Sequence, residues 1–203
     1  FYEHDGPHML ELWRTDGTES GTMMLKDIHP HGSSMVTTGP NDPVAMGNMI
    51  YFWADDYTHG AELWKSDGTE SGTVMVKDIR AGGYSSYGGS ELIVFGNNLF
   101  FSAITGAAGN ELWKSDGTET GTVMVKDINP SYSSSPTNFT VVGNTLYFTA
   151  TDGTNGEELW RTDGTESGTM MIKDIRQGNL RSYIQYPTVF GDDLYFSATD
   201  AIN

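Results

Sequence analysis

The sequence predicts an all-β fold: a β-propeller of about four four-stranded blades, closed by a split blade or by strand sharing. Two patterns recur along the 203 residues with a period close to fifty. Between them, short apolar runs alternate with segments rich in Gly, Ser, Thr, Asn and Asp, as in short strands joined by tight turns. Four antiparallel strands repeated at this period are typical of propeller blades of the kelch length.

The first recurring pattern is an eighteen-residue run from Glu11-Leu12-Trp13 to Ile28. It begins at four positions: Glu11, Glu62, Glu111 and Glu158. Its tryptophans are Trp13, Trp64, Trp113 and Trp160, which are 51, 49 and 47 residues apart. Loops therefore absorb the differences in length, and we interpret residues 1–203 as a single repeat domain.

The second pattern places Gly-Asn or Gly-Asp between two apolar runs, which predicts a hairpin turn. It covers residues 45–54, 94–103, 141–150 and 189–198. Each full unit therefore contains about four strands: one on either side of this turn, one with Glu-Leu-Trp, and one that ends at Lys-Asp-Ile.

The ends of the chain align with each other, because residues 1–5 match residues 196–200. We therefore expect residues 187–198 to pair in one sheet with the strands of Trp13 and Met24, within the chain or from a neighbouring copy. An open segment of a larger propeller or filament is the alternative. The chain begins Phe1-Tyr2-Glu3 without an initiator Met, so we expect a processed form or a fragment.

The repeated hairpin has a predicted register, counted inward from the six-residue turn at 67–72. Trp64 then lies opposite Met75, Leu63 opposite Val76, and Glu62 opposite Lys77. The same count in every unit predicts four Trp–Met contacts and four cross-strand Glu–Lys ion pairs.

The string Glu62-Leu63-Trp64-Lys65-Ser66-Asp67-Gly68-Thr69 and its three companions resemble the ELWxxDGT repeat family of large extracellular and cell-surface proteins, mostly bacterial. The resemblance covers nearly the whole chain. It implies a secreted β protein built from repeats, in a family without an agreed enzymatic activity or ligand. The Asp-Gly-Thr turns are also similar to the aspartate-box turns of sialidase-type propellers, which are chiefly structural.

Charge limits the partners, because 27 acidic against 11 basic residues give a net charge of −16. Such a surface repels phosphate backbones and anionic lipids, so we expect no nucleic acid and no membrane insertion. No apolar run approaches the length of a bilayer span. The acidic surface could bind divalent cations or basic partners, or it could simply keep the protein solvated. The chain has no cysteine, so the sequence does not indicate a redox compartment.

Aromatic residues that break the repeat are the candidate ligand contacts, because repeated positions more often pack between blades. Trp53 replaces the Ser102, Thr149 and Ser197 of the other units. Tyrosines in variable Ser/Gly-rich segments complete the predicted site: Tyr84, Tyr87, Tyr132 and Tyr183, with Tyr186 nearby. Such rings could stack on sugars, and ordinary loop packing is the alternative.

Calcium is the predicted cofactor, if there is one, because it binds flexible loops that offer several carboxylate and carbonyl oxygens. The candidate ligands are Asp152, Asn155, Glu157, Asp55 and Asp56. Asp side chains that hold their own turns are the alternative. Four histidines of the first unit, His4, His8, His29 and His31, could bind a transition metal, or be solvated loop residues.

No residues stand out as catalytic, because the sequence lacks a nucleophile elbow, a phosphate-binding glycine loop and a carboxylate pair outside the repeat. The leading hypothesis is a secreted, non-catalytic binding module, lectin-like or adhesive, with several equivalent sites for glycans or other extracellular surface components. Self-assembly into an extracellular fibre or surface layer is the alternative, and a glycan-active enzyme is a third.

Overall fold

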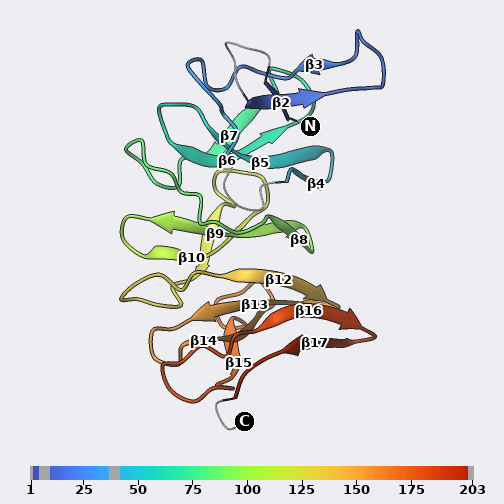
Figure 1. The fold of residues 1–203 in the computed structure, drawn as a ribbon. Coiled ribbons are helices and arrows are strands. Elements are labelled where there is room, and N and C mark those ends of the chain that lie inside the picture. Colours follow the sequence, from blue (N-terminus) through green and yellow to red (C-terminus); the bar gives the residue numbers. More distant parts are fainter. Residues whose placement is uncertain (1, 5–9, 37–41, 201–203) are drawn as a thin grey trace.

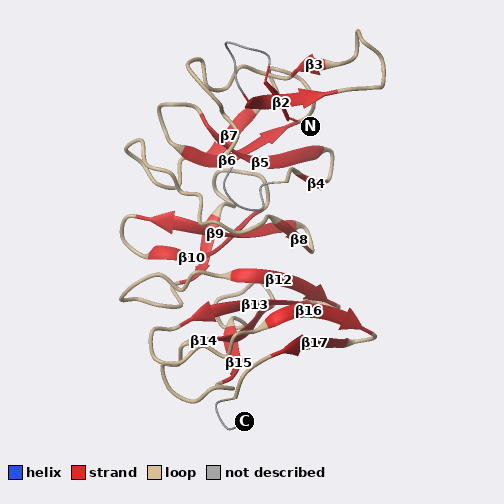
Figure 2. Cartoon of the chain, viewed as in Figure 1, coloured by secondary structure: helices blue, strands red, loops and turns tan. Residues whose placement is uncertain are grey.

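Strands joined by loops form all the regular structure of the described residues in the computed structural model (Figures 1 and 2). The model describes residues 2–4, 10–36 and 42–200, and of Tyr2–His4 it describes the backbone alone. Within these ranges no helix is long and apolar enough to cross a membrane. The predicted all-β class is confirmed.

Three complete sheets contain four antiparallel strands each, paired in chain order. The second sheet has β4 (Val44–Met46), β5 (Met49–Asp55), β6 (Ala61–Ser66) and β7 (Val74–Lys77). The third has β8 (Ile93–Phe95), β9 (Asn98–Thr105), β10 (Gly109–Ser115) and β11 (Val123–Lys126). The fourth has β12 (Thr137–Val142), β13 (Thr145–Thr151), β14 (Glu157–Thr162) and β15 (Met170–Lys173).

Two smaller sheets lie at the ends. The first sheet has β1 (Tyr2–His4), β2 (Leu10–Arg14) and β3 (Met23–Met24), and the fifth has β16 (Gln185–Phe190) and β17 (Asp193–Ser197). Among the described residues, the first sheet has no counterpart of the opening strand of a complete sheet, and the fifth sheet has no counterpart of the last two strands.

The sheets follow one another in an open row, with the two ends of the chain at opposite ends of the molecule (Figure 1). β16 and β17 pair with each other, and neither pairs with β2 or β3. The predicted four-bladed propeller, closed by a split blade or by strand sharing, is therefore wrong. Likewise, residues 187–198 do not pair within the chain with the strands of Trp13 and Met24.

Apolar clusters between consecutive sheets hold the row together. Between the first and second sheets, Leu12, Leu25 and Ile28 pack against Phe52 and Trp64. The equivalent residues form a cluster between the second and third sheets, and another between the third and fourth. A middle sheet is therefore apolar on both faces, as a sheet covered on both sides requires.

The predicted Gly-Asn hairpin turns are confirmed. In each complete sheet and in the fifth sheet, Gly and Asn or Asp form a two-residue loop, as between Met46 and Met49. The glycine alone has a positive φ, +62° at Gly47, which identifies a type II′ turn with glycine at its first position.

The Asp-Gly-Thr turns are held by their own side chains. In the second sheet, the N–H and O–H of Thr69 donate to Asp67 Oδ1 at 2.9 and 2.7 Å, and Thr69 Oγ1 accepts from the Gly72 N–H at 2.9 Å. A Cβ on Gly72 would overlap the Asp67 carboxylate, so the turn requires glycine there. The other three turns repeat this arrangement.

The predicted hairpin register is half right. Trp64 lies opposite Met75, and all four Trp–Met pairs occur. The predicted Glu–Lys pairs are wrong, because a bulge between Leu63 and Trp64 places Leu63 opposite Lys77. The two other complete sheets have the same bulge.

The repeated glutamates are buried and bind backbone instead. Glu62 is fully buried and accepts hydrogen bonds from the N–H of Ile79 at 3.0 Å and the hydroxyl of Ser86 at 2.5 Å. Burial raises the pKa of Glu62 to about 7, although these donors oppose the shift. Burial also raises the pKa of Glu11, Glu111 and Glu158.

The repeated lysines reach the next sheet. Lys77 Nζ donates to the Thr122 carbonyl at 2.8 Å, and Lys65 Nζ to the Gly117 carbonyl at 2.7 Å. The first and third sheets make the equivalent contacts, through Arg14, Lys26, Lys114 and Lys126. We call these bonds the junction contacts, and each of the three junctions between the first four sheets has two of them.

Candidate ligand-binding face

The loop between β5 and β6 and the loops that follow β7, β11 and β15 lie along one side of the row, at the left in Figure 1, and each carries an exposed tyrosine. Tyr57 lies between β5 and β6, and the others lie in the loops that follow β7, β11 and β15. We call this side, defined by Tyr57, Tyr84, Tyr132 and Tyr183, the tyrosine face. Their side chains are 55 to 78% exposed, which is unusual for rings of this size and leaves them accessible to a ligand.

Glycines in the hairpins allow the loops that carry Tyr84, Tyr132 and Tyr183 to pack closely against them. A Cβ on Gly60 would lie 2.7 Å from the Tyr84 carbonyl carbon, so the loop after β7 can rest on the β5–β6 hairpin only where a side chain is absent. Gly60 also has a φ of +74°, a region that glycine adopts without strain. Gly109 and Gly156 seat the loops near Ser133 and Leu180 in the same way.

Cationic and aromatic neighbours fix the orientation of three rings. The Arg80 guanidinium lies 5.1 Å from the Tyr84 ring centre, and that of Arg176 lies 5.9 Å from the Tyr183 ring centre. Tyr57 contacts both His29 and His31 edge-on, with ring centres 5.5 and 5.4 Å apart. Supported rings lose little freedom when a ligand binds, which favours recognition.

A groove lies beside the Tyr132 ring. It has a volume of about 440 Å³ and is formed by the hairpin at 107–109 and the loop at 130–133. Its lining is small and neutral, with Ala107, Ala108, Ser131 and Ser133 around the ring. An uncharged ligand with hydroxyl groups fits this lining better than an ion does.

Two predicted ligand residues lie elsewhere. Trp53 is 1% exposed and packs edge-on against Tyr87 and Phe101 in the core between the second and third sheets. Tyr87 is half-buried against the same cluster. Trp53 is therefore a packing residue between sheets, and the sequence alone does not distinguish a large side chain that packs there from one that binds a ligand.

Tyr57 belongs to the face although sequence reasoning did not select it. The sequence around it, Asp55-Asp56-Tyr57-Thr58-His59, could have identified Tyr57, because it is a polar hairpin loop with one aromatic residue. Tyr57 has a φ of +73°, in the left-handed region that residues other than glycine seldom adopt.

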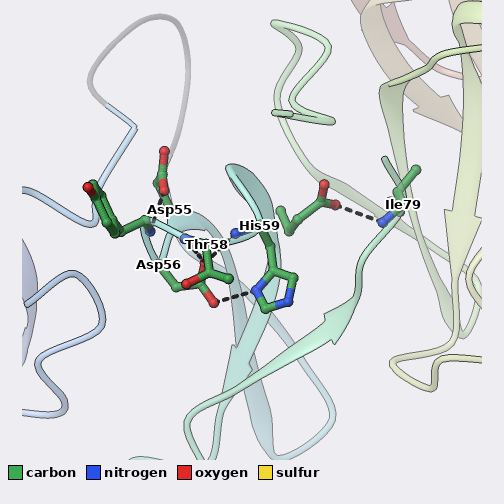
Figure 3. A network of polar contacts seen from close by, with 7 residues as sticks. Asp55, Asp56, Thr58, His59 and Ile79 are labelled. Carbon is green, nitrogen blue, oxygen red and sulfur yellow. Dashed lines mark hydrogen bonds and ion pairs between the residues drawn. The ribbon is translucent and has the colours of Figure 1, made fainter. Parts of the chain in front are cut away.

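The candidate calcium ligands Asp55 and Asp56 accept hydrogen bonds from residues of their own loop (Figure 3). Asp55 Oδ1 accepts from the Tyr57 N–H at 2.7 Å, and Asp56 Oδ2 lies 2.7 Å from His59 Nδ1. Burial alone would raise the pKa of Asp56, but hydrogen bonds from His59 and Thr58 hold it below the ordinary value. The bond to Asp56 raises the pKa of His59.

The second acidic loop has the same design. Asp152 Oδ1 accepts from the N–H groups of Thr154 and Asn155 at 2.8 Å, and Asp152 Oδ2 accepts from the Asn155 amide at 2.7 Å. Glu157 opens β14. In residues 10–36 and 42–200, no three acidic or histidine side chains gather as metal ligands would. Calcium binding stays a prediction.

The predicted histidine cluster is partly outside the described residues, since His8 is not described and only the backbone of His4 is. His29 and His31 adjoin each other and Tyr57, with the His31 N–H donating to His29 Nδ1 at 3.3 Å. They contribute to the tyrosine face as ring contacts.

Comparisons with known proteins give no family. No family model matches the chain, and no curated protein matches it. The chain is similar to the crystal structure of a computationally designed protein, Ika8, at 17% sequence identity and a TM-score of 0.45. The match covers 98% of this chain and 52% of the designed one, so the chain spans about half the length of that protein. The resemblance to the ELWxxDGT family stays a prediction.

Proposed function

We propose that the chain is a secreted, non-catalytic binding protein whose tyrosine face binds an extended neutral glycan. The observation that carries the proposal is the row of exposed, supported tyrosine rings on loops of successive sheets. A flat apolar ring face suits the C–H face of a sugar, and the phenol hydroxyl can bond to a neighbouring hydroxyl.

The repeated tyrosines raise the affinity of the tyrosine face for a polymer. One ring on a sugar is a weak contact, but a polymer that reaches two rings makes the second contact within the complex, at a high effective concentration. The net charge of −16 opposes acidic glycans, so a neutral polymer is the better ligand.

The test is a glycan array that contains neutral and acidic polymers, followed by titration of the best ligand. We expect binding to long neutral glycans and progressively weaker binding to short ones. The triple variant Tyr84→Ala, Tyr132→Ala and Tyr183→Ala should lose binding at least tenfold while it keeps its melting temperature, because these rings are exposed.

Phe190→Ala is the control, because Phe190 is also an exposed aromatic residue but lies at the end of β16. It should bind like the unchanged chain. Binding that survives the triple variant, or an array without any neutral ligand, overturns the proposal.

A further inference from the structure

The fourth sheet carries two cationic hydrogen-bond donors at the positions that form the junction contacts in the other sheets. Among the described residues, no carbonyl of a following sheet accepts from them. Arg161 and Lys173 occupy the repeat positions of Lys65 and Lys77, which bond to carbonyls of the next sheet. Among the described residues, neither Arg161 nor Lys173 reaches such a carbonyl, and the Arg161 guanidinium contacts Met170 Sδ at 3.6 Å.

The same face of the fourth sheet is apolar and uncovered. Ile172 is 46% exposed, whereas the equivalent Val76 and Val125 are each 6% exposed beneath the next sheet. A groove of about 470 Å³ runs here between the fourth and fifth sheets. It is lined by Leu159, Met171, Ile172, Leu194 and Phe196, with Arg161 and Lys173 alongside.

At every other junction, a Glu-Leu-Trp hairpin covers this position, with its turn carbonyls on the two cations. Within residues 10–36 and 42–200, the fifth sheet has only β16 and β17, so no hairpin covers this position and one edge of β17 is unpaired. The shape, the apolar area and the two donors therefore specify one kind of occupant.

The first sheet presents such a hairpin in β2 and β3. Its turn has the same sequence pattern, and no lysine or arginine of the described residues bonds to the carbonyls of Gly17 or Thr22. Trp13 is half-buried, whereas Trp64, Trp113 and Trp160 are buried against the preceding sheet. The two ends of the molecule are thus complementary in shape and in hydrogen bonding.

We propose that the open face of the fourth and fifth sheets binds the β2–β3 hairpin of a second copy, which prolongs the row of sheets. Arg161 then bonds to the Gly17 carbonyl of the second copy and Lys173 to its Thr22 carbonyl. Ile172 and Leu159 pack against its Trp13 and Met24.

Strand pairing follows from the internal repeat. Because Tyr147 lies opposite Arg161 and Phe148 opposite Trp160, Tyr195 would lie opposite Arg14 and Phe196 opposite Trp13 of the second copy. β17 then takes the place of β1, which is three residues long and pairs with only part of β2. The contact is head-to-tail, so each copy keeps one open end and the row can grow.

Sedimentation of the 203-residue chain over a hundredfold range of concentration tests association. We expect the mean mass to rise with concentration. Ile172→Asp and the double variant Arg161→Glu, Lys173→Glu should lower the association constant at least tenfold and leave the melting temperature of the monomer unchanged. Arg181→Glu, which makes half of the double variant's charge change on an exposed loop residue, is the control. A chain that remains monomeric, or that associates equally in all variants, overturns the proposal.

Cross-linking in trans tests the register, because the chain has no cysteine of its own. Two singly substituted copies, Tyr195→Cys and Arg14→Cys, should form a mixed disulfide after gentle oxidation. Val189→Cys, an exposed position on β16, should not cross-link with Arg14→Cys. Deletion of residues 1–4 removes β1 and should strengthen association. Equal cross-linking by both pairs, or weaker association after the deletion, overturns this arrangement.

Discussion

The four repeated glutamates each hold a loop of their own sheet by accepting hydrogen bonds from its backbone. Glu111, for example, accepts from the N–H groups of Ile128 and Ser134 at 2.8 Å and from the Ser134 hydroxyl at 2.6 Å. The sequence alone suggested a lysine partner, because a hairpin counted without a bulge places the two side chains opposite each other. A bulge leaves little trace in the sequence when all three complete sheets carry it.

These carboxyls make stability depend on pH. For Glu62, the pKa is about 7 in the folded chain and near 4.5 when unfolded, so its favourable contribution is complete below pH 4.5 and is lost as the pH rises through 7. The turn aspartates act in the opposite direction, because hydrogen bonds from Thr69 and its equivalents lower the pKa of Asp16, Asp67, Asp116 and Asp163. Their contribution is lost as the pH falls below 4.

We therefore expect the melting temperature to be highest at mildly acidic pH and to decline between pH 5 and 8. Thermal unfolding followed by circular dichroism across this range measures it. The variant Glu62→Gln should show a shallower decline, because one titrating carboxyl is removed. A decline of the same slope in that variant would contradict the assignment to Glu62.

Gly72 tests the Asp-Gly-Thr turn. The variant Gly72→Ala forces the Asp67 carboxylate from its place, and overpacking of this kind costs about 1–3 kcal/mol. The control Gly106→Ala adds the same methyl group to a loop where nothing lies within 4 Å, and should change stability little. Chemical denaturation measures both, and equal effects would mean that crowding at Gly72 is relieved without cost.

The strands and hairpins of the structure lie close to where the sequence predicted them. The Gly-Asn hairpin turns and the Trp–Met register could be predicted because each depends on residues less than twenty positions apart. The junction contacts could not be predicted, because Lys65 Nζ bonds to a backbone carbonyl 52 residues away and a carbonyl has no signature in sequence. The same reason hid Arg161 and Lys173 as candidate residues.

Lysines at repeat-equivalent positions should differ in their effect on stability. Lys77→Met removes a charged donor from the Thr122 carbonyl, and we expect a loss of about 1–2 kcal/mol. Lys173→Met changes the equivalent lysine at the open end and should leave the isolated monomer unchanged. Urea unfolding at low protein concentration compares them, and a similar loss in both variants would contradict the role of the junction contacts.

For the whole molecule, the sequence indicated the unit but not the arrangement of units. The path of a row of sheets depends on the small rotation between neighbours, summed over the repeats. Repeat length does not reveal that rotation, nor does it reveal which side chains pack at each junction, such as Trp53 against Phe101. The tyrosines were partly predicted because variable loops lie at the surface, whereas Trp53 was misplaced for lack of burial information.

An open row should be most stable in its middle. Amides of β9 and β10 lie in a sheet covered on both faces, whereas β16 and β17 carry exposed Val189, Phe190 and Tyr195. We expect hydrogen exchange to be slowest in β9 and β10 and fastest in β16 and β17. Uniform protection from end to end would indicate one cooperative unit instead.

The junction contacts end on backbone oxygens, and this has an evolutionary consequence. A backbone carbonyl is present whatever side chain occupies its residue, so a unit that keeps its turn and its two cations can follow any other such unit. Duplication or deletion of a whole unit inside a gene would therefore leave every remaining junction intact. The length of the molecule, and with it the number of tyrosines it displays, could change in a single genetic event without any compensating substitution.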